Sequence, residues 1–427
     1  MELCRCATPD ELRSLTAHPS PIVRGYAFWA LSSNGGSDLL PILLQHIGDT
    51  AAVDVQFGCV VHHPRVGDFL IDVVNGRYGK GEAGLGPAQR AQLDSVLLFT
   101  PNNLEARSDL LLEVGPEPAL YPRIRELTRT EQDPCALVAL AKYHKEEDVP
   151  LILDQYVRDL SEEGREVVHP LEAIQEFPHP AFRTTLERHL RSSLDEGLHA
   201  REWSHLYQAI AQYKDRWALG LLNLPFGAAP KPSTREFRLD YLLDALWSVD
   251  APLYDTLLWK LWSEEDRIDR DVLDRLSSRD PERAYRTMKL DVAEASRFRQ
   301  GMHGSFRSSI PSDSLLAIML ERVLERDSAF GVAMIVKHIQ DTDVLNFEVF
   351  AQAAGRIQDS SFVALLLGRA RKESNPYYLL KAAEALLAYQ DPAINRRLLA
   401  VMAEKRDLNE AWAGKELFVL LRRKGIE

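Results

Sequence analysis

The 427-residue sequence has few cysteines, no long apolar run and no excess of basic residues. Its four cysteines are too few for a disulfide framework in a chain of this length, so we expect a reducing, cytoplasmic setting. The N-terminal residues Met1 to Cys6 carry no apolar signal-peptide core, and no run of about 18 uncharged apolar residues could span a bilayer. The sequence therefore predicts neither secretion by a standard signal nor insertion into a membrane.

Acidic residues outnumber basic ones, and the excess is concentrated in one segment. The chain has 51 Lys and Arg against 63 Asp and Glu, a net charge of −12. Residues 101–200 hold 11 basic and 20 acidic side chains, so this segment carries −9 of that charge. Since phosphate binding requires clustered Lys and Arg, the balance disfavours a nucleic-acid-binding protein and favours one that attracts a basic partner. The acidic residues that we expect on the binding surface are Glu146, Glu147, Asp148, Glu162 and Glu163.

Apolar residues recur with helical spacing almost throughout the chain. In residues 315–324 they fall at i, i+1, i+4, i+5, i+8 and i+9, as in an amphipathic helix. The period-two alternation that marks half-buried strands is hard to find. Prolines, which are favoured at the first turn of a helix, recur at intervals of 33 to 46 residues between Pro19 and Pro180. We therefore predict an all-α fold of stacked two-helix repeats, roughly eight to ten in number.

One segment resembles a known repeat. Residues 18–31, His-Pro-Ser-Pro-Ile-Val-Arg-Gly-Tyr-Ala-Phe-Trp-Ala-Leu, resemble the second helix of a HEAT repeat, whose usual form is Asp-Pro-x-Pro-x-Val-Arg-x-x-Ala-x-x-Ala-Leu. Histidine replaces the family's acid here, but two Asp-Pro segments keep the spacing from acid to arginine. The resemblance implies a right-handed α-solenoid of HEAT-like (armadillo-type) repeats, in which such acids and arginines form a ladder between neighbouring repeats. The candidate ladder residues are Arg24, Asp280, Arg286, Asp391 and Arg397.

Two stretches interrupt the helical pattern. Residues 225–234 contain three prolines, and we predict a loop or hinge there between an acidic N-terminal repeat array, residues 1–224, and a near-neutral C-terminal array, residues 235–427. The second stretch, residues 296–312, is rich in glycine and serine and contains no acidic residue. Backbone amides and cationic side chains in such a loop can bind a phosphate or an acidic peptide. The candidate anion-binding residues are Arg297, Arg299, His303 and Arg307.

Signatures of catalysis and metal binding are scarce. No Gly-x-Ser-x-Gly, Walker-type loop or His-Glu-x-x-His motif occurs, so the sequence assigns no catalytic residue and no cofactor. Cys59 and His62 are spaced as on one helical turn, but together with Cys4 and Cys6 they depart from the spacing that structural zinc prefers, and we expect no metal.

The sequence as a whole predicts a binding protein. We expect a non-enzymatic scaffold or adaptor that binds a protein partner on the concave surface of its repeats. Two alternatives stay open: a dedicated inhibitor or immunity protein for one enzyme, and a HEAT-like DNA-repair-type or small-molecule-modifying enzyme. The inhibitor predicts tight one-to-one binding that weakens steeply with salt, whereas the enzyme predicts a compact pocket with convergent titratable groups.

Overall fold

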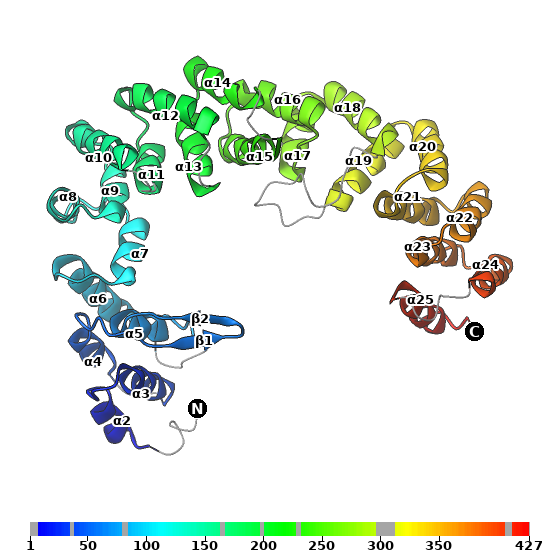
Figure 1. The fold of residues 1–427 in the computed structure, drawn as a ribbon. Coiled ribbons are helices and arrows are strands. Elements are labelled where there is room, and N and C mark those ends of the chain that lie inside the picture. The colour runs from blue at the N-terminus through cyan, green and yellow to red at the C-terminus, as the bar shows by residue number, and fades with distance from the viewer. Residues whose placement is uncertain are drawn as a thin grey trace. The chain divides into compact units, whose positions relative to one another are not determined.

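The computed structural model describes residues 7–34, 38–78, 84–162, 167–196, 200–227, 232–295, 312–405 and 412–426. Their regular structure is helical apart from one two-stranded hairpin, so the predicted all-α class is confirmed for this part of the chain (Figure 1). Within these ranges, every helix is too short or too polar to cross a lipid bilayer. The chain divides into two compact units, Met1–Leu186 and Glu187–Glu427.

The elements follow one another in chain order. The first unit contains α2 (Pro9–Leu15), α3 (Pro21–Ser33), α4 (Leu40–Gln45), β1 (Val55–Phe57), β2 (Val60–His62), α5 (Val66–Val74), α6 (Pro87–Phe99), α7 (Glu105–Glu113), α8 (Tyr121–Glu126), η1 (Leu127–Glu131), α9 (Pro134–Ala141), η2 (Glu146–Asp148), α10 (Val149–Ser161), α11 (Val168–Glu176) and η3 (Pro180–Phe182). The division between the units falls inside α12 (Arg183–Glu196). The second unit continues with α13 (Ala200–Ala211), α14 (Arg216–Leu222), η4 (Leu224–Phe226), α15 (Pro232–Ser248), η5 (Pro252–Tyr254), α16 (Asp255–Glu265), α17 (Arg270–Arg279), α18 (Pro281–Ala293), α19 (Ser312–Arg326), α20 (Ser328–Gln340), α21 (Val344–Ile357), α22 (Ser361–Lys372), α23 (Pro376–Leu387), α24 (Pro392–Glu404) and α25 (Trp412–Arg423).

The predicted hinge at 225–234 lies within the second unit, between η4 and α15. These two elements pack against each other, and residues 228–231 between them lie outside the described residues. A division of the chain into arrays 1–224 and 235–427 stays a prediction.

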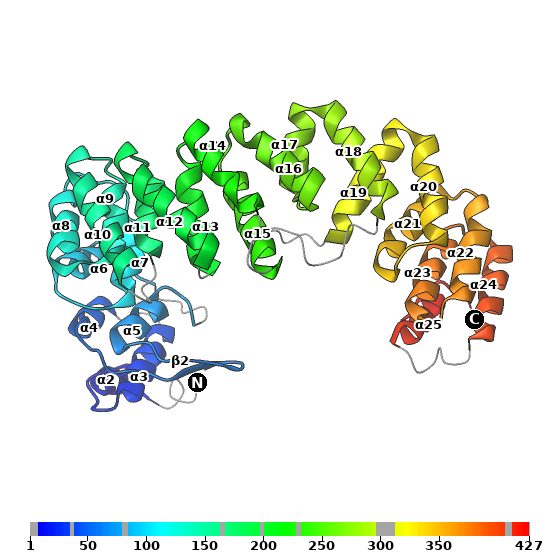
Figure 2. The same cartoon turned by 45° about the horizontal axis from the view of Figure 1, so that its top comes forward.

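Alternate helices pack side by side in rows within each unit. In the first unit, α3, α5, α7, α9 and α11 form a continuous row, and α2, α8 and α10 pack against members of it. In the second unit, α21, α23 and α25 form one row while α20, α22 and α24 form another, as both views of the ribbon show (Figures 1 and 2). Contacts with both the next helix and the one after it, which are typical of stacked helical hairpins, are made by α4, α13, α19, α20, α22 and α23.

Proline and a capping side chain begin many of the helices, as the sequence predicts. The missing N–H of proline costs nothing in the first turn, where that donor has no partner within the helix. Asp133 shows the accompanying cap, since its Oδ1 accepts hydrogen bonds from the amides of Cys135 at 3.0 Å and Ala136 at 3.1 Å. The prolines of this kind are Pro9, Pro134, Pro281, Pro376 and Pro392.

The hairpin departs from the expected helical pattern. Strands β1 and β2 are antiparallel, with Val55 opposite His62. Gly58 in the connecting turn has a φ of 58°, which glycine adopts without the steric penalty of a side chain. Cys59 lies in the same turn and His62 on β2, so the two residues do not share a helical turn as their spacing suggested.

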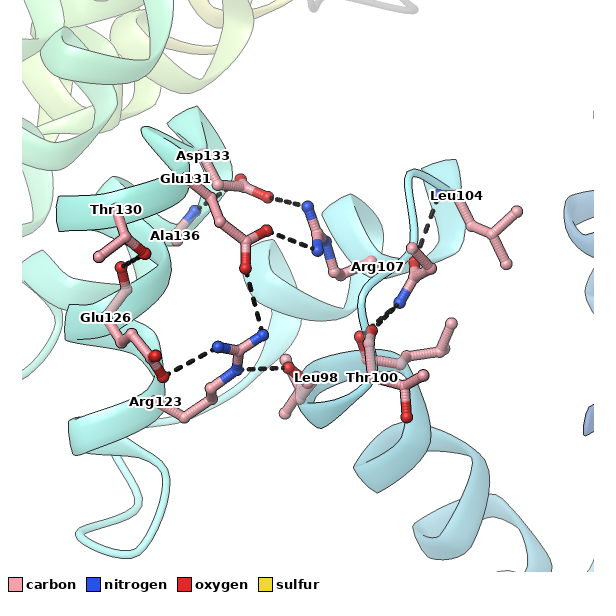
Figure 3. Close-up of polar contacts among 12 residues, drawn as sticks. Leu98, Thr100, Leu104, Arg107, Arg123, Glu126, Thr130, Glu131, Asp133 and Ala136 are labelled. Carbon is pink, nitrogen blue, oxygen red and sulfur yellow. Dashed lines mark hydrogen bonds and ion pairs between the residues drawn. The ribbon is translucent and has the colours of Figure 1, made fainter. Parts of the chain in front are cut away.

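An ionic network around the buried Arg107 and Asp133 joins α7 to the segment that precedes α9 (Figure 3). Arg107 donates from Nη1 to Glu131 Oε2 at 3.1 Å and from Nη2 to Asp133 Oδ2 at 3.0 Å. Arg123 reaches the other oxygen of Glu131 at 3.3 Å and the carbonyl oxygen of Leu98 at 2.8 Å. Because Asp133 also caps α9, Arg107 fixes a helix start on the neighbouring helix of its own row.

The predicted ladder residues differ in their contacts. Arg24 pairs with both oxygens of Asp49, at 2.8 and 3.0 Å, and so joins α3 to the turn after α4. Asp280 caps its own helix, α18. Arg286 is exposed, and its Nε donates to the carbonyl oxygen of Glu282 in the same helix at 3.4 Å. The contact between helices is therefore present at Arg24, while Arg286 bonds within its own helix.

The predicted ladder pair Asp391 and Arg397 resembles the pair Asp280 and Arg286 in its contacts. Asp391 caps α24, and Arg397 lies exposed on that helix. Among the described residues, two other capping acids are each held by a base from a neighbouring helix. One is Asp133 in the network above, and the other is Asp327, which caps α20 and accepts a hydrogen bond from Lys289 of α18 at 2.9 Å. The expected kind of contact exists, at residues that the sequence pattern did not single out.

Candidate functional site

A groove of about 770 Å³ lies over three consecutive helices of the first unit, α5, α6 and α7 (blue to cyan in Figure 1). A second hollow of about 500 Å³ beside His62 and His63 shares Asp72, Arg77 and Glu105 with it, so the two are continuous. We call the larger one the acidic groove, because carboxylates dominate its charged lining and only Arg77 and Arg90 oppose them. These carboxylates are Asp68, Asp72, Asp94, Glu105, Asp109 and Glu113.

Helical periodicity brings the carboxylates to one surface. Glu105, Asp109 and Glu113 lie at i, i+4 and i+8 of α7, and Asp68 and Asp72 lie at i and i+4 of α5. Residues four apart in a helix share a face. The opposite faces of both helices are buried in the core of the unit. Burial of the apolar faces therefore turns the acidic faces toward the groove.

No ion pair with another described residue compensates the acidic face of α7. Glu105, Asp109 and Glu113 are all exposed, and none of them forms an ion pair with another described residue. Like charges four residues apart destabilise a helix by about 0.2–0.5 kcal/mol per pair. The helix thus keeps a charge pattern that weakens it, and local departures from the most stable arrangement are typical of functional surfaces.

Asp68 forms part of the groove lining and is almost completely buried. Asp68 is 6% exposed, and its Oδ1 accepts a hydrogen bond from the amide of Ala106 at 3.0 Å. Its Oδ2 has no hydrogen-bond partner among the described residues. Burial raises the pKa of Asp68, and the amides of Ala106 and Glu105 oppose that rise only in part. The lining of the acidic groove therefore includes a buried carboxylate with an unused acceptor.

Asp72 is already engaged within the unit. It accepts two hydrogen bonds from Arg77 Nη1, at 3.0 and 3.1 Å, and one from the hydroxyl of Tyr78 at 3.0 Å. Burial and the charge of Asp72 both raise the pKa of Tyr78, so that hydroxyl stays protonated and acts as a donor. Asp72 therefore anchors the chain after α5 and contributes less free charge to the groove than α7 does.

Asp94 on α6 faces the charged stripe of α7 across the groove. Burial raises its pKa, the charge of Glu113 adds to the rise, and the charge of Arg90 opposes it. Each of the three helices thus supplies at least one carboxylate that lacks a full set of partners. The chemical property that the groove offers is negative charge with free hydrogen-bond acceptors, which suits a cationic occupant.

No metal cluster accompanies this charge. Among the described residues, no three His, Cys, Asp or Glu side chains converge closely enough to hold a metal ion. Cys4 and Cys6, which the sequence placed in a candidate metal set, lie outside the described residues.

The predicted acidic surface at 146–163 is partly internal. Asp148 is 1% exposed, and it accepts hydrogen bonds from Arg125 Nε at 2.8 Å and from the hydroxyl of Tyr121 at 2.8 Å. Glu147 is exposed and accepts a hydrogen bond from the same hydroxyl at 2.6 Å. Asp148 therefore holds α8 and α10 together, and little of its carboxylate faces solvent.

Two of the remaining predicted acids are at the surface. Glu146 is exposed and lies 2.9 Å from the His179 ring, and Glu162 is exposed at the end of α10. Glu163 lies outside the described residues. The four predicted anion-binding residues also lie outside them: Arg297, Arg299, His303 and Arg307.

The acidic residues of α7 recur every fourth position, and a search for consecutive charges does not detect this pattern. Glu146, Glu147 and Asp148 are adjacent in sequence and attract notice as a run, although adjacent residues in a helix point in different directions. Glu105, Asp109 and Glu113 are separated by three residues each and share a helix face. Counting charges at i, i+4 and i+8 would have identified them.

Comparison with known proteins assigns no family to this chain. No protein-family model, no curated protein and no solved structure matches it. The geometry and charge of the acidic groove are therefore the basis of a functional assignment.

The raised pKa of Asp68 predicts a pH-dependent stability. The folded chain holds this proton to a higher pH than the unfolded chain does, so stability falls as the pH rises from the ordinary carboxyl pKa to the raised one. We expect Asp68→Asn, which cannot ionise, to be more stable than the wild type at pH 7, with a difference that shrinks toward pH 4. Urea unfolding at both pH values measures this, with Asp109→Asn on the exposed face of α7 as control. A variant that is less stable than the wild type at pH 7 would contradict the expectation.

Proposed function

We propose that the chain is a non-enzymatic scaffold or adaptor that binds a protein partner through the acidic groove. The packing of alternate helices in rows within each unit supports HEAT-like repeats, and we extend it to a right-handed α-solenoid on that ground. Stacked repeats of this kind expose long helical surfaces suited to macromolecular partners. A cytoplasmic setting is part of the proposal, and the free thiols of Cys59 and Cys135 agree with it.

One observation carries this proposal. Carboxylates from three consecutive helices meet in a groove, and those on α7 have no ion-pair partner among the described residues. Charges that form no ion pair within the described part of the fold are available to another molecule. A protein partner with a basic surface would neutralise them and would associate faster because of them. Phosphate-rich nucleic acid would be repelled by the same surface.

Affinity purification with the full chain tests the proposal. The variant is Glu105→Gln/Asp109→Asn/Glu113→Gln, which removes the charge of α7 and keeps the size of its side chains. We expect at least about a tenfold loss of the captured partner, because electrostatic contacts at an interface contribute on the order of 1.4 kcal/mol or more together. The matched control is Glu146→Gln/Glu147→Gln/Glu162→Gln, which removes the same charge elsewhere on the first unit.

The outcomes separate a specific groove from general acidity. Capture by the wild type and by the control, but not by the α7 variant, supports the proposal. Equal loss in the two variants would show that net charge alone attracts the partner, and absence of any specific partner would count against a scaffold. The α7 variant is not expected to unfold, since it removes repulsion between like charges within the helix.

A further inference from the structure

The acidic groove also indicates what kind of segment would occupy it, if the proposed function holds. We infer that the occupant is a short, extended peptide segment of the partner with basic residues at alternate positions, one of which places its cationic head on Asp68. The inference rests on the buried carboxylate, the apolar lining beside it and the spacing of charge along α7.

Asp68 supplies the anchoring point. Its Oδ1 is occupied by the amide of Ala106, whereas its Oδ2, with almost no exposed surface, accepts no hydrogen bond among the described residues. Burying a hydrogen-bond acceptor without a donor is unfavourable, and burying an ionised carboxylate without one is more unfavourable still. A lysine or arginine head would provide both the missing donor and the opposite charge, in a charge-assisted hydrogen bond. A cation is therefore the kind of group that best complements the ionised form of Asp68.

Apolar side chains line the groove between the carboxylates. Ile71 of α5, Leu93 and Leu97 of α6 and Leu110 of α7 contribute to its walls. Lysine and arginine bury their aliphatic stems against such surfaces while their charged heads reach a polar partner. A bare metal ion would make no use of this lining, and the described carboxylates do not converge on a metal position. The mixture of leucines and carboxylates therefore matches long cationic side chains.

The charge spacing along α7 favours an extended chain. Carboxylates four residues apart in a helix recur about every 6 Å, so the stripe from Glu105 to Glu113 spans about 12 Å. Alternate residues of an extended chain lie about 6.6 Å apart and point to the same side. A segment of about five residues covers that length, and peptides so short do not hold a helix in water. Basic residues at every second position would therefore each meet a carboxylate.

A peptide-binding measurement on the full chain tests this inference. The probe is a short fluorescein-labelled peptide of alternating arginine and serine, and its comparator has the same composition with the arginines in one block. We expect the alternating peptide to bind at least about tenfold more tightly than the block peptide by fluorescence anisotropy. We also expect Asp68→Asn to weaken the alternating peptide at least about tenfold, the change that loss of one charge-assisted hydrogen bond produces. Glu146→Gln should leave it unchanged.

The Asp68→Asn side chain can still accept the hydrogen bond from the Ala106 amide, and unchanged amide hydrogen exchange in α5 and α7 would verify that the groove is folded. The inference would be overturned if the two peptides bound equally well, or if Asp68→Asn bound the alternating peptide as tightly as the wild type does. It would also be overturned if spermine, added at the same total charge, displaced the two peptides equally well. If a partner is captured through the α7 carboxylates while Asp68→Asn captures it equally well, the proposed function stands and this inference fails. If neither variant affects capture, both fail.

Discussion

Replacing Arg107 with methionine is expected to lower the free energy of unfolding of the first unit by about 3–5 kcal/mol, the usual effect of removing one partner of a buried ion pair. Arg107 is only 9% exposed, and it neutralises both Glu131 and Asp133 (Figure 3). Methionine keeps most of the apolar stem but provides no donor. The buried Asp133 then loses its cationic partner in a poorly solvated site and must still cap α9, whereas the exposed Glu131 keeps Arg123.

Hydrogen exchange of the backbone amides in α7 and α9 measures this effect in the full chain, because it reports local and global opening by segment. Arg13→Met is the matched control in the same unit. Its guanidinium lies 3.8 Å from Asp10 in an exposed pair, and such pairs contribute about 0–1 kcal/mol.

A second variant separates the ion pair from simple misfolding. Arg107→Met/Asp133→Asn also removes the charge of Asp133, which Arg107→Met alone leaves without its partner. Asparagine remains a good helix cap. We expect the double variant to be more stable than the sum of the two single effects predicts, by about 0.5–3 kcal/mol. A loss below about 0.5 kcal/mol in Arg107→Met would show that the network contributes nothing to stability.

Local signals explain why the helices were predictable. A capping side chain followed by proline, as at Asp133-Pro134 and Asp391-Pro392, acts within a single turn, and the apolar period acts within a single helix. The hairpin was missed because its strands have three residues each, too few for an alternating pattern to be detected.

The ionic network depends on backbone conformation that the sequence does not reveal. Glu131 ends the π-helical turn η1, and Gln132 after it has a φ of 53°, in the left-handed region. These two departures from an α-helix turn Glu131 and Asp133 toward the same arginine. No propensity rule predicts a π-helical turn at this point, so the pairing of Arg107 had to come from the structure.

One part of the candidate site could be predicted from the sequence, and the other part could not. The stripe of charge on α7 follows from a spacing of four residues and is present in the sequence. The burial of Asp68 is not, because it depends on the close approach of α7, whose Ala106 amide bonds to that carboxylate across a separation of 38 residues. A carboxylate in an amphipathic helix is ordinarily expected at the surface, and only tertiary packing shows that this one is enclosed.

Replacing Gly355 with valine is expected to destabilise the second unit by about 3 kcal/mol, the upper end of the usual effect of overpacking. Gly355 lies on α21, where that helix packs against α23. A Cβ there would lie 2.9 Å from the Cα of Ala385 and 3.0 Å from its carbonyl oxygen. Both are backbone atoms, so the two helices must separate along the row that contains α25, since no side chain can move aside to make room.

Gly368 on α22 offers the matched control, because a Cβ there meets nothing within 4 Å. Valine has a somewhat better helix propensity than glycine, so Gly368→Val should change stability by less than about 0.5 kcal/mol, in the stabilising direction. Urea unfolding of the full chain, with hydrogen exchange in α21, α23 and α25, distinguishes the two variants. Equal stability of Gly355→Val and Gly368→Val would mean that the α21–α23 contact can open at no cost. The row of helices would then be held by its outer contacts, and close backbone packing would have no part in the stability of the stack.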